Sequence, residues 1–249
     1  MMMDGWFKLG EHWSEEFQMY LTGRPEKRKA QRIFTLDEVP GVNKLVSSDK
    51  GYYTNAEQTL ECFYISPTLD SIQYVEDSIT DALDTRGQYV DFIPYYDPAY
   101  VYSVIVINEP TFKGGASYMR GVSFSFDLSI APFKKRIGGT KIITLTKNMR
   151  LYNPEKYPSD PKLKIYGNGN INIFINNRKT TFLNVENVIE IDSDPDVMEV
   201  FKEESRVLIN QHQKFVRQNF PILDPGFNDI SWNGNVTKIE LEPRWQTKI

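Results

Sequence analysis

The sequence predicts a mainly β protein in two parts, an α+β part followed by an all-β part. Several segments alternate strictly between apolar and polar residues, as half-buried strands do. Asn-Gly and similar turn pairs recur in the second half, whereas a single segment has clear helical periodicity. With 249 residues, 40% of them hydrophobic, the chain is long enough for one large domain or two ordinary ones.

The helix is expected near residues 68–84. Ser66 is suitable as its cap and Pro67 as its first residue. Because this helix lies alone between strands, it most simply packs on a sheet. Its predicted apolar stripe consists of Ile72, Val75, Ile79 and Leu83.

Residues 122–130 form the clearest predicted strand, because every even-numbered side chain is apolar and every odd-numbered one is polar. A basic run and Gly138-Gly139 follow it, and a new β-rich region then begins. We therefore place a domain boundary near residue 133, which gives a first domain of residues 1–133 and a second of residues 134–249.

Turn signals divide the second domain into short strands. Asn168-Gly169, Asn176-Asn177 and Asn233-Gly234 each separate two apolar segments. Asn-Gly suits the positive φ angles of a type I′ hairpin turn. Short strands at this spacing predict a sandwich or a barrel.

Two further segments complete the second half. Residues 196–220 contain good helix formers but also break naturally at Glu204-Ser205 into two strand-like pieces, so their residues alone leave helix and strand open. Residues 238–245 alternate strictly and predict a final strand. Pro243 cannot donate a ladder hydrogen bond, so this strand end is expected at a sheet edge.

Composition limits the classes of function. The net charge of −4 and the isoelectric point of about 5.4 argue against a general nucleic-acid binder. Cys62 is the single cysteine, which excludes an internal disulfide and a thiolate metal cluster. The first residues do not resemble a signal peptide, and no apolar stretch is long enough to span a membrane.

Residues with catalytic or metal-binding chemistry are few, and no cofactor is expected. His12 and His212 lack a recognisable nucleophile motif, and no phosphate-binding loop is present. Glu240 and Glu242 share a strand face, where a glycosidase pair and a charged outer face are both conceivable. Asp192, Asp194, Asp196 and Glu203 have the spacing of a calcium loop, but Val197 replaces its glycine, so an acidic turn is the simpler interpretation.

A basic run early in the chain is a candidate contact surface. It contains no interleaved aromatic residues and lies in an acidic protein, which favours a solvated loop or an acidic partner subunit over phosphates. The aromatic residues of segment 89–102 are suited to stacking on sugars, to an interface or to a core. The five residues of the basic run are Arg24, Lys27, Arg28, Lys29 and Arg32.

Several stretches, taken in order, resemble the distal tail (Dit) proteins of siphophages that infect Gram-positive bacteria. The second half contains "YNPEKYPSDPKLKIYGNGNINIFINN", "FPILDPGFNDISWNG" and "VTKIELEPRW", and the first half "WFKLGEHWSEEFQMYLTGRP", "FTLDEVPGVNKLV" and "GYYTNAEQTLECFYI". The sequence departs from the family at Gln246, where Arg is usual, and at residues 40–43, where Pro-Gly-Arg-Asp is usual. The resemblance covers nearly the whole chain.

The resemblance implies a ring-forming β-sandwich domain with one helix, followed by a galectin-like β-sandwich. Residues 197–220 are then a strand pair, and the last strand closes the second core through Trp232, Ile239, Leu241 and Trp245, so truncation before Trp245 should be costly.

The implied function is structural and non-enzymatic. Such proteins form a hexameric ring, often as two stacked rings, in the virion tail tip or baseplate, and are made in the host cytoplasm. The ring contacts the tail tube, a tail-associated hub protein and receptor-binding or baseplate proteins, and DNA meets it only in transit. The alternatives are a carbohydrate-binding module that adheres to the host cell wall and, third, an enzyme.

Overall fold

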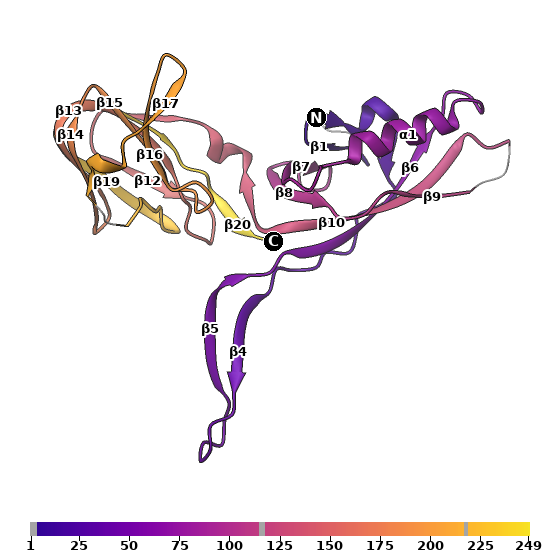
Figure 1. Ribbon diagram of the computed structural model, residues 1–249, viewed down its shortest axis with the longest axis horizontal. Helices are drawn as coiled ribbons and strands as arrows, with labels where there is room; N and C mark the ends of the chain where they lie inside the picture. Colours follow the sequence, from indigo (N-terminus) through magenta and orange to yellow (C-terminus); the bar gives the residue numbers. More distant parts are fainter. Residues whose placement is uncertain (1–3, 115–117, 217–218) are drawn as a thin grey trace. The chain divides into compact units, whose positions relative to one another are not determined.

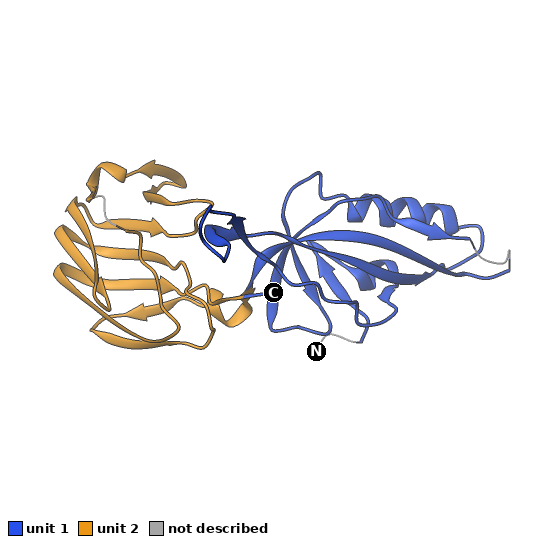
Figure 2. Ribbon diagram, turned by 90° about the horizontal axis from the view of Figure 1, so that it is seen from below, with its two compact units in different colours: residues 1–134, 248–249 blue, residues 135–247 orange. Residues whose placement is uncertain are grey.

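The computed structural model describes residues 4–114, 118–216 and 219–249, and the chain divides into two compact units. The first unit consists of residues 1–134 together with 248–249, and the second of residues 135–247 (Figure 2). Strands dominate both units, and α1 (Ile72–Leu83) is the one α-helix within the described ranges. The expected mainly β fold with a single helix is therefore confirmed. The described part of the chain holds no helix that meets the length and hydropathy needed to cross a bilayer.

The first unit is built around a sheet in the order β2-β1-β7-β8-β10-β6-β3, with β9 and β20 also paired to β10. The strands in this order are β2 (His12–Trp13), β1 (Phe7–Leu9), β7 (Val90–Pro94), β8 (Tyr100–Val106), β10 (Gly121–Arg136), β6 (Ala56–Ile65) and β3 (Met19–Leu21), with β9 (Thr111–Lys113) and β20 (Gln246–Lys248). A second, two-stranded sheet consists of β4 (Arg32–Asp37) and β5 (Val46–Tyr53).

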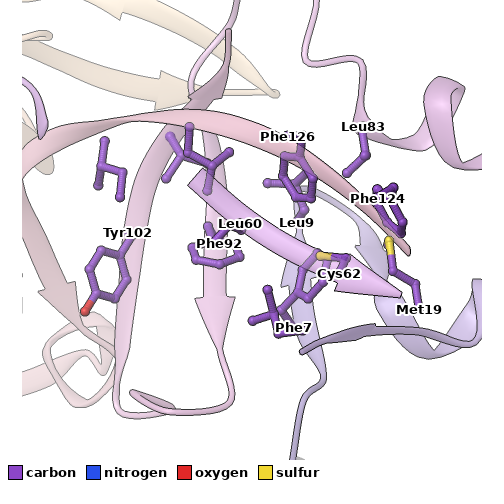
Figure 3. Close-up of a cluster of buried hydrophobic side chains, with 14 of the residues drawn as sticks. Phe7, Leu9, Met19, Leu60, Cys62, Leu83, Phe92, Tyr102, Phe124 and Phe126 are labelled. Atoms are coloured by element: carbon purple, nitrogen blue, oxygen red, sulfur yellow. The ribbon is translucent and has the colours of Figure 1, made fainter. Parts of the chain in front are cut away.

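The alternating sequence of β10 produces the first core. β10 and β6 pair in register over ten residues, from Gly121 opposite Ile65 to Ile130 opposite Ala56. The apolar side chains of both strands therefore face the same side of the sheet, where Phe124 and Phe126 lie against Leu60 and Cys62 (Figure 3). Burying large apolar side chains in this way stabilises each by roughly 1.5–3 kcal/mol.

Helix α1 covers this core through Ile79 and Leu83, which are fully buried. It begins at Ile72, later than residue 68, and its N-cap residue is Ser71. The hydroxyls of Ser66, Thr68 and Ser71 hydrogen-bond to one another and to the carbonyl of Thr68, which holds the preceding residues in a turn. Side-chain bonds of this kind compete with helix formation and explain the late start.

The second unit contains one sheet of nine strands that folds over its own core. The strands are β11 (Ile143–Leu145), β12 (Met149–Asn153), β13 (Lys162–Ile175), β14 (Arg178–Val185), β15 (Val188–Asp192), β16 (Glu199–Glu204), β17 (Val207–Asn210), β18 (Phe215–Val216) and β19 (Gly226–Glu242). β13 pairs with β15 through its first half and with β14 through its second half, while β19 accompanies it throughout. Apolar side chains from both halves of β13 and from the strands paired with them form one buried cluster.

Two of the three predicted turns in this unit are wrong. Asn168-Gly169 lies inside β13 and Asn233-Gly234 inside β19, at register shifts where the paired strands bend together. Both glycines have positive φ angles, +81° and +110°, so the sequence signal for positive φ marks bulged corners instead of hairpins. Asn176-Asn177 does form the predicted turn between β13 and β14.

The ambiguous segment contains the strand pair that the resemblance implies. β16 and β17 pair in antiparallel fashion around Ser205 and Arg206, which both have positive φ. This geometry is a type I′ turn made without glycine. A short 3₁₀ turn, η3 (His212–Lys214), and β18 follow.

The end of the chain differs from the expected division. β19 ends at Glu242, and Trp245 is buried in the second core. Lys248 and Ile249 lie in the first unit, where the N–H of Ile249 donates to the carbonyl of Pro132 at 3.1 Å. The side chain of Ile249 belongs to the first core.

Candidate functional site

The hairpin β4–β5 is an exposed apolar feature of the first unit. It projects away from the main sheet (Figure 1), and β4 and β5 pair only with each other among the described strands. Phe34 and Leu36 lie on one of its faces and are each 52% exposed, and Val46 and Tyr52 are exposed on the other. A two-stranded hairpin is marginally stable alone in water, and open edges invite pairing. This hairpin therefore has the properties of a surface that another chain covers.

Arg32 fixes the base of the hairpin and is used inside the chain. Its guanidinium donates to both carboxylate oxygens of Asp49 and, at 2.9 Å, to the hydroxyl of Tyr53. These hydrogen bonds lower the pKa of Asp49. Arg32 therefore sets the position of the hairpin and belongs to its supporting structure.

The other residues of the basic run differ from Arg32 in their partners. Arg24 and Lys27 lie over the ring of Tyr96, at 5.8 and 4.6 Å from its centroid. Burial lowers the pKa of Lys27 and raises that of Tyr96 to about 12. Arg28 lines a pocket of roughly 180 Å³ with Glu26, Glu57 and Asp127, and Lys29 is exposed. Arg24 and Lys29 lie close enough to Lys27 to lower its pKa further, whereas Arg32 is engaged at the hairpin.

Two of the four candidate calcium ligands, Asp192 and Asp194, form ion pairs with cations of the same chain. Arg244 donates to both carboxylate oxygens of Asp192, at 2.6 and 3.0 Å, and Lys135 donates to Asp194 at 2.9 Å. Asp196 lies in the turn that precedes β16, and Glu203 is on β16 itself. Within the described ranges, no group of three acidic, histidine or cysteine side chains is arranged to hold a metal ion.

The histidines and the paired carboxylates have local partners. His12 contacts Glu16 at 3.3 Å, and Nε2 of His212 accepts the N–H of Val200. Glu240 accepts hydrogen bonds from Lys238 and Tyr166, and Glu242 lies 3.4 Å from the guanidinium of Arg244. These groups support the fold locally.

The second unit has an exposed aromatic pair that the sequence does not reveal. Tyr152 on β12 lies opposite Phe227 on β19, with ring centroids 5.0 Å apart. Arg150 packs over Phe227 and lies 3.5 Å from Asp229, its cross-strand neighbour. The two aromatic residues are 75 positions apart in sequence, so only the strand register brings them together.

Neither the protein-family models nor the curated proteins gave a match to this sequence, but solved structures of phage proteins do resemble the chain. The Dit protein of phage SPP1, described as a paradigm of the hub adsorption apparatus in phages infecting Gram-positive bacteria, aligns with a TM-score of 0.69 at 11% identity over 97% of this chain and 98% of that one. A chain of the phage P2 baseplate in its activated conformation with Ca aligns with a TM-score of 0.57 at 9% identity over 99% of both chains. A chain of the p2 baseplate with Sr gives 0.55 at 8% identity over 98% of both. This chain has the Dit fold.

The Dit fold accounts for the four expected core residues of the second half. Ile239 and Leu241 are fully buried and Trp245 is nearly so, whereas Trp232 is half-buried at the margin of the cluster. Trp245 also accepts the N–H of Arg136 through its carbonyl at 2.7 Å. The sequence pattern does not identify the exposed hairpin β4–β5, because neither β4 nor β5 alternates strictly between apolar and polar residues.

Proposed function

We infer that this chain is a distal tail protein, a structural component of a siphophage virion at the tail tip or baseplate. The observation that carries this proposal is the end-to-end correspondence with the SPP1 Dit protein, at a TM-score of 0.69 over 97% of the chain. The first unit is the ring-forming domain and the second the galectin-like domain. The protein is made in the host cytoplasm and acts without catalysis.

Six copies form a ring that joins the tail tube to a tail-associated hub protein and to baseplate or receptor-binding proteins, and DNA passes through its channel. A closed ring needs a heterologous interface repeated around an axis. The hairpin β4–β5 supports this proposal, because it extends from the first unit with apolar side chains on both faces. In the basic run, Arg28 and Lys29 are the residues we assign to contact with an acidic neighbour.

Light scattering coupled to size-exclusion chromatography tests the ring directly. The whole chain should elute with a mass near six or twelve protomers, and the variant Phe34→Ser/Leu36→Ser should shift it towards the monomer. Tyr74→Ser is the matched control, because Tyr74 is 75% exposed on α1, away from the hairpin. Both variants should keep the unfolding midpoint of the unaltered protein.

Two results would count against this proposal. A monomer at every concentration and salt level would contradict self-assembly of the ring. A ring that persists in the Phe34→Ser/Leu36→Ser variant would exclude the hairpin as its interface.

A further inference from the structure

The outer face of β12 and β19 brings an aromatic pair next to a charged pair. Tyr152 lies directly opposite Phe227, and Arg150 directly opposite Asp229. Residues two apart on a strand share a face and lie about 7 Å from each other. The four side chains therefore form a compact square on one face of the sheet.

This face is turned to solvent. Tyr152 is 55% and Phe227 59% exposed, whereas the intervening Leu151 and Asn228 point into the unit and are buried. The guanidinium of Arg150 lies over the Phe227 ring, 4.4 Å from its centroid, which holds it against one face of that ring. Exposed aromatic rings held in place by neighbours can receive a ligand at small entropic cost.

The charges of the square favour a neutral ligand. Arg150 and Asp229 lie 3.5 Å apart and neutralise each other, so an anionic ligand would meet the carboxylate as well as the guanidinium. A guanidinium offers several N–H donors in a plane, and a carboxylate offers only acceptors. Two adjacent hydroxyls of one ligand satisfy both groups, because one accepts from Arg150 while the other donates to Asp229.

The size of the square favours a single ring over a protein surface. Specific protein interfaces bury about 800 Å² on each partner around an apolar centre. Here the apolar area is two adjacent rings, with the charged pair directly beside them and Ser231 next along β19. A sugar ring has one face of C–H groups that packs on aromatic rings and an edge of hydroxyls that reaches polar neighbours.

We propose that Tyr152, Phe227, Arg150 and Asp229 form a binding site for a neutral pyranose residue, a hexose or an N-acetylhexosamine of a surface polysaccharide. The aromatic rings contact the C–H face of the sugar, and the charged pair holds two vicinal hydroxyls. This activity goes beyond the proposed function, because assembly of a ring does not require it. Repetition of a weak site around a ring would raise the avidity for a polysaccharide without new contacts.

Saturation-transfer NMR with the whole chain provides the test. The probes are methyl β-glucopyranoside, methyl β-galactopyranoside and N-acetylglucosamine, and glycerol 3-phosphate serves as an acyclic anionic control. At least one sugar should bind with a Kd on the order of 1 mM, with the strongest transfer to its C–H protons. Tyr152→Ala and Phe227→Ala should each weaken binding about tenfold, which corresponds to the loss of one aromatic contact.

Tyr74→Ala is the matched control and should leave binding unchanged, because it removes a tyrosine that is even more exposed, at 75%, from the other unit. Asp229→Asn should weaken sugar binding and leave the unfolding midpoint unchanged, since Asp229 is exposed. Absence of transfer to all three sugars would overturn the proposal. Unchanged sugar binding in Tyr152→Ala would also overturn it, and so would preferential binding of glycerol 3-phosphate. A loss of oligomer mass in Tyr152→Ala would overturn it too, because it would identify the square as a protein interface.

Discussion

At the scale of single residues, Asp160 and Asp194 lie in one network of charges, but their pKa values are shifted in opposite directions. Burial raises the pKa of Asp160 above its ordinary value of 3.8, although Gln246 donates a hydrogen bond to it at 3.1 Å. Burial alone would also raise the pKa of Asp194, but the hydrogen bond from Lys135 and the nearby Arg244 outweigh it and lower that pKa. The nearest cation therefore decides the sign of each shift.

We predict that Asp160→Asn stabilises the protein at pH 7, by on the order of 0.5 kcal/mol. A raised folded pKa means that the native state binds the proton more tightly, so the penalty of the charged form is fully present above that pKa. The penalty falls as the pH drops towards 3.8, and the advantage of Asp160→Asn should vanish there. Urea unfolding at pH 7 and pH 3.5 measures both values.

Asp194→Asn is the matched comparison, and its effect should have the opposite sign. The lowered pKa of Asp194 contributes stability above its ordinary value of 3.8, and that stability is lost as the pH falls through the folded pKa. Asp194→Asn should therefore destabilise the protein at pH 7. A stabilising effect from both substitutions would show that charge repulsion between the two carboxylates dominates the network.

At the scale of elements, the corner of β13 and β19 depends on close backbone approach. A Cβ at Gly167 would lie 2.3 Å from the carbonyl oxygen of Asn235 and 3.1 Å from Cα of Val236. Neither backbone atom can move without shifting the paired strand. Gly234 has the same constraint from the other side, with a Cβ 2.4 Å from the carbonyl oxygen of Asn170 and a φ of +110°.

Gly167→Ala should therefore cost about 1–3 kcal/mol of unfolding free energy, the usual range for overpacking. Gly138→Ala is the control, because a Cβ at Gly138 would meet no atom within 4 Å, and it should change stability by less than about 0.5 kcal/mol. Thermal unfolding of both variants beside the unaltered protein measures the difference. Equal midpoints for the two variants would mean that the corner opens freely, contrary to the close contacts.

The same corner shows what the sequence can and cannot predict. Asn233-Gly234 signals a positive φ angle, and the residue has one, but local sequence does not distinguish a hairpin turn from a bulge inside a bent strand. The alternation in residues 122–130 is sufficient to predict a strand with one buried face, and that face fixes the register of β10. The strands in segment 197–220 could be predicted only from the family resemblance, because the pairing of β16 with β17 overrides the helix propensity of these residues.

The candidate surfaces were hardest to predict because they depend on distant pairings. In the basic run, Arg32 binds Asp49 while Lys27 packs on Tyr96, and neither partner follows from adjacency along the chain. Tyr152 and Phe227 are ordinary strand residues when considered separately. Only the antiparallel register of β12 with β19 places them side by side.

At the scale of the whole molecule, the two proposed surfaces belong to different compact units and should act independently. The hairpin with Phe34 and Leu36 is in the first unit, and the face with Tyr152 and Phe227 is in the second. Substitutions that share no interaction partners usually have additive effects. The Phe34→Ser/Leu36→Ser variant should therefore no longer elute with the mass of a ring. Its Kd for a single sugar, measured per binding site, should stay the same as in the unaltered protein.

Tyr152→Ala should show the converse, with full ring mass and weakened sugar binding. Binding to immobilised polysaccharide measures assembly and sugar binding together, because linked sites bind far more tightly than a single site. Both variants should lose this binding, the first because the sites are no longer linked and the second because each site is weakened. If the hairpin variant retains the polysaccharide avidity of the unaltered protein while it is monomeric, multivalency has no part in binding, and the ring and the sugar site have separate functions.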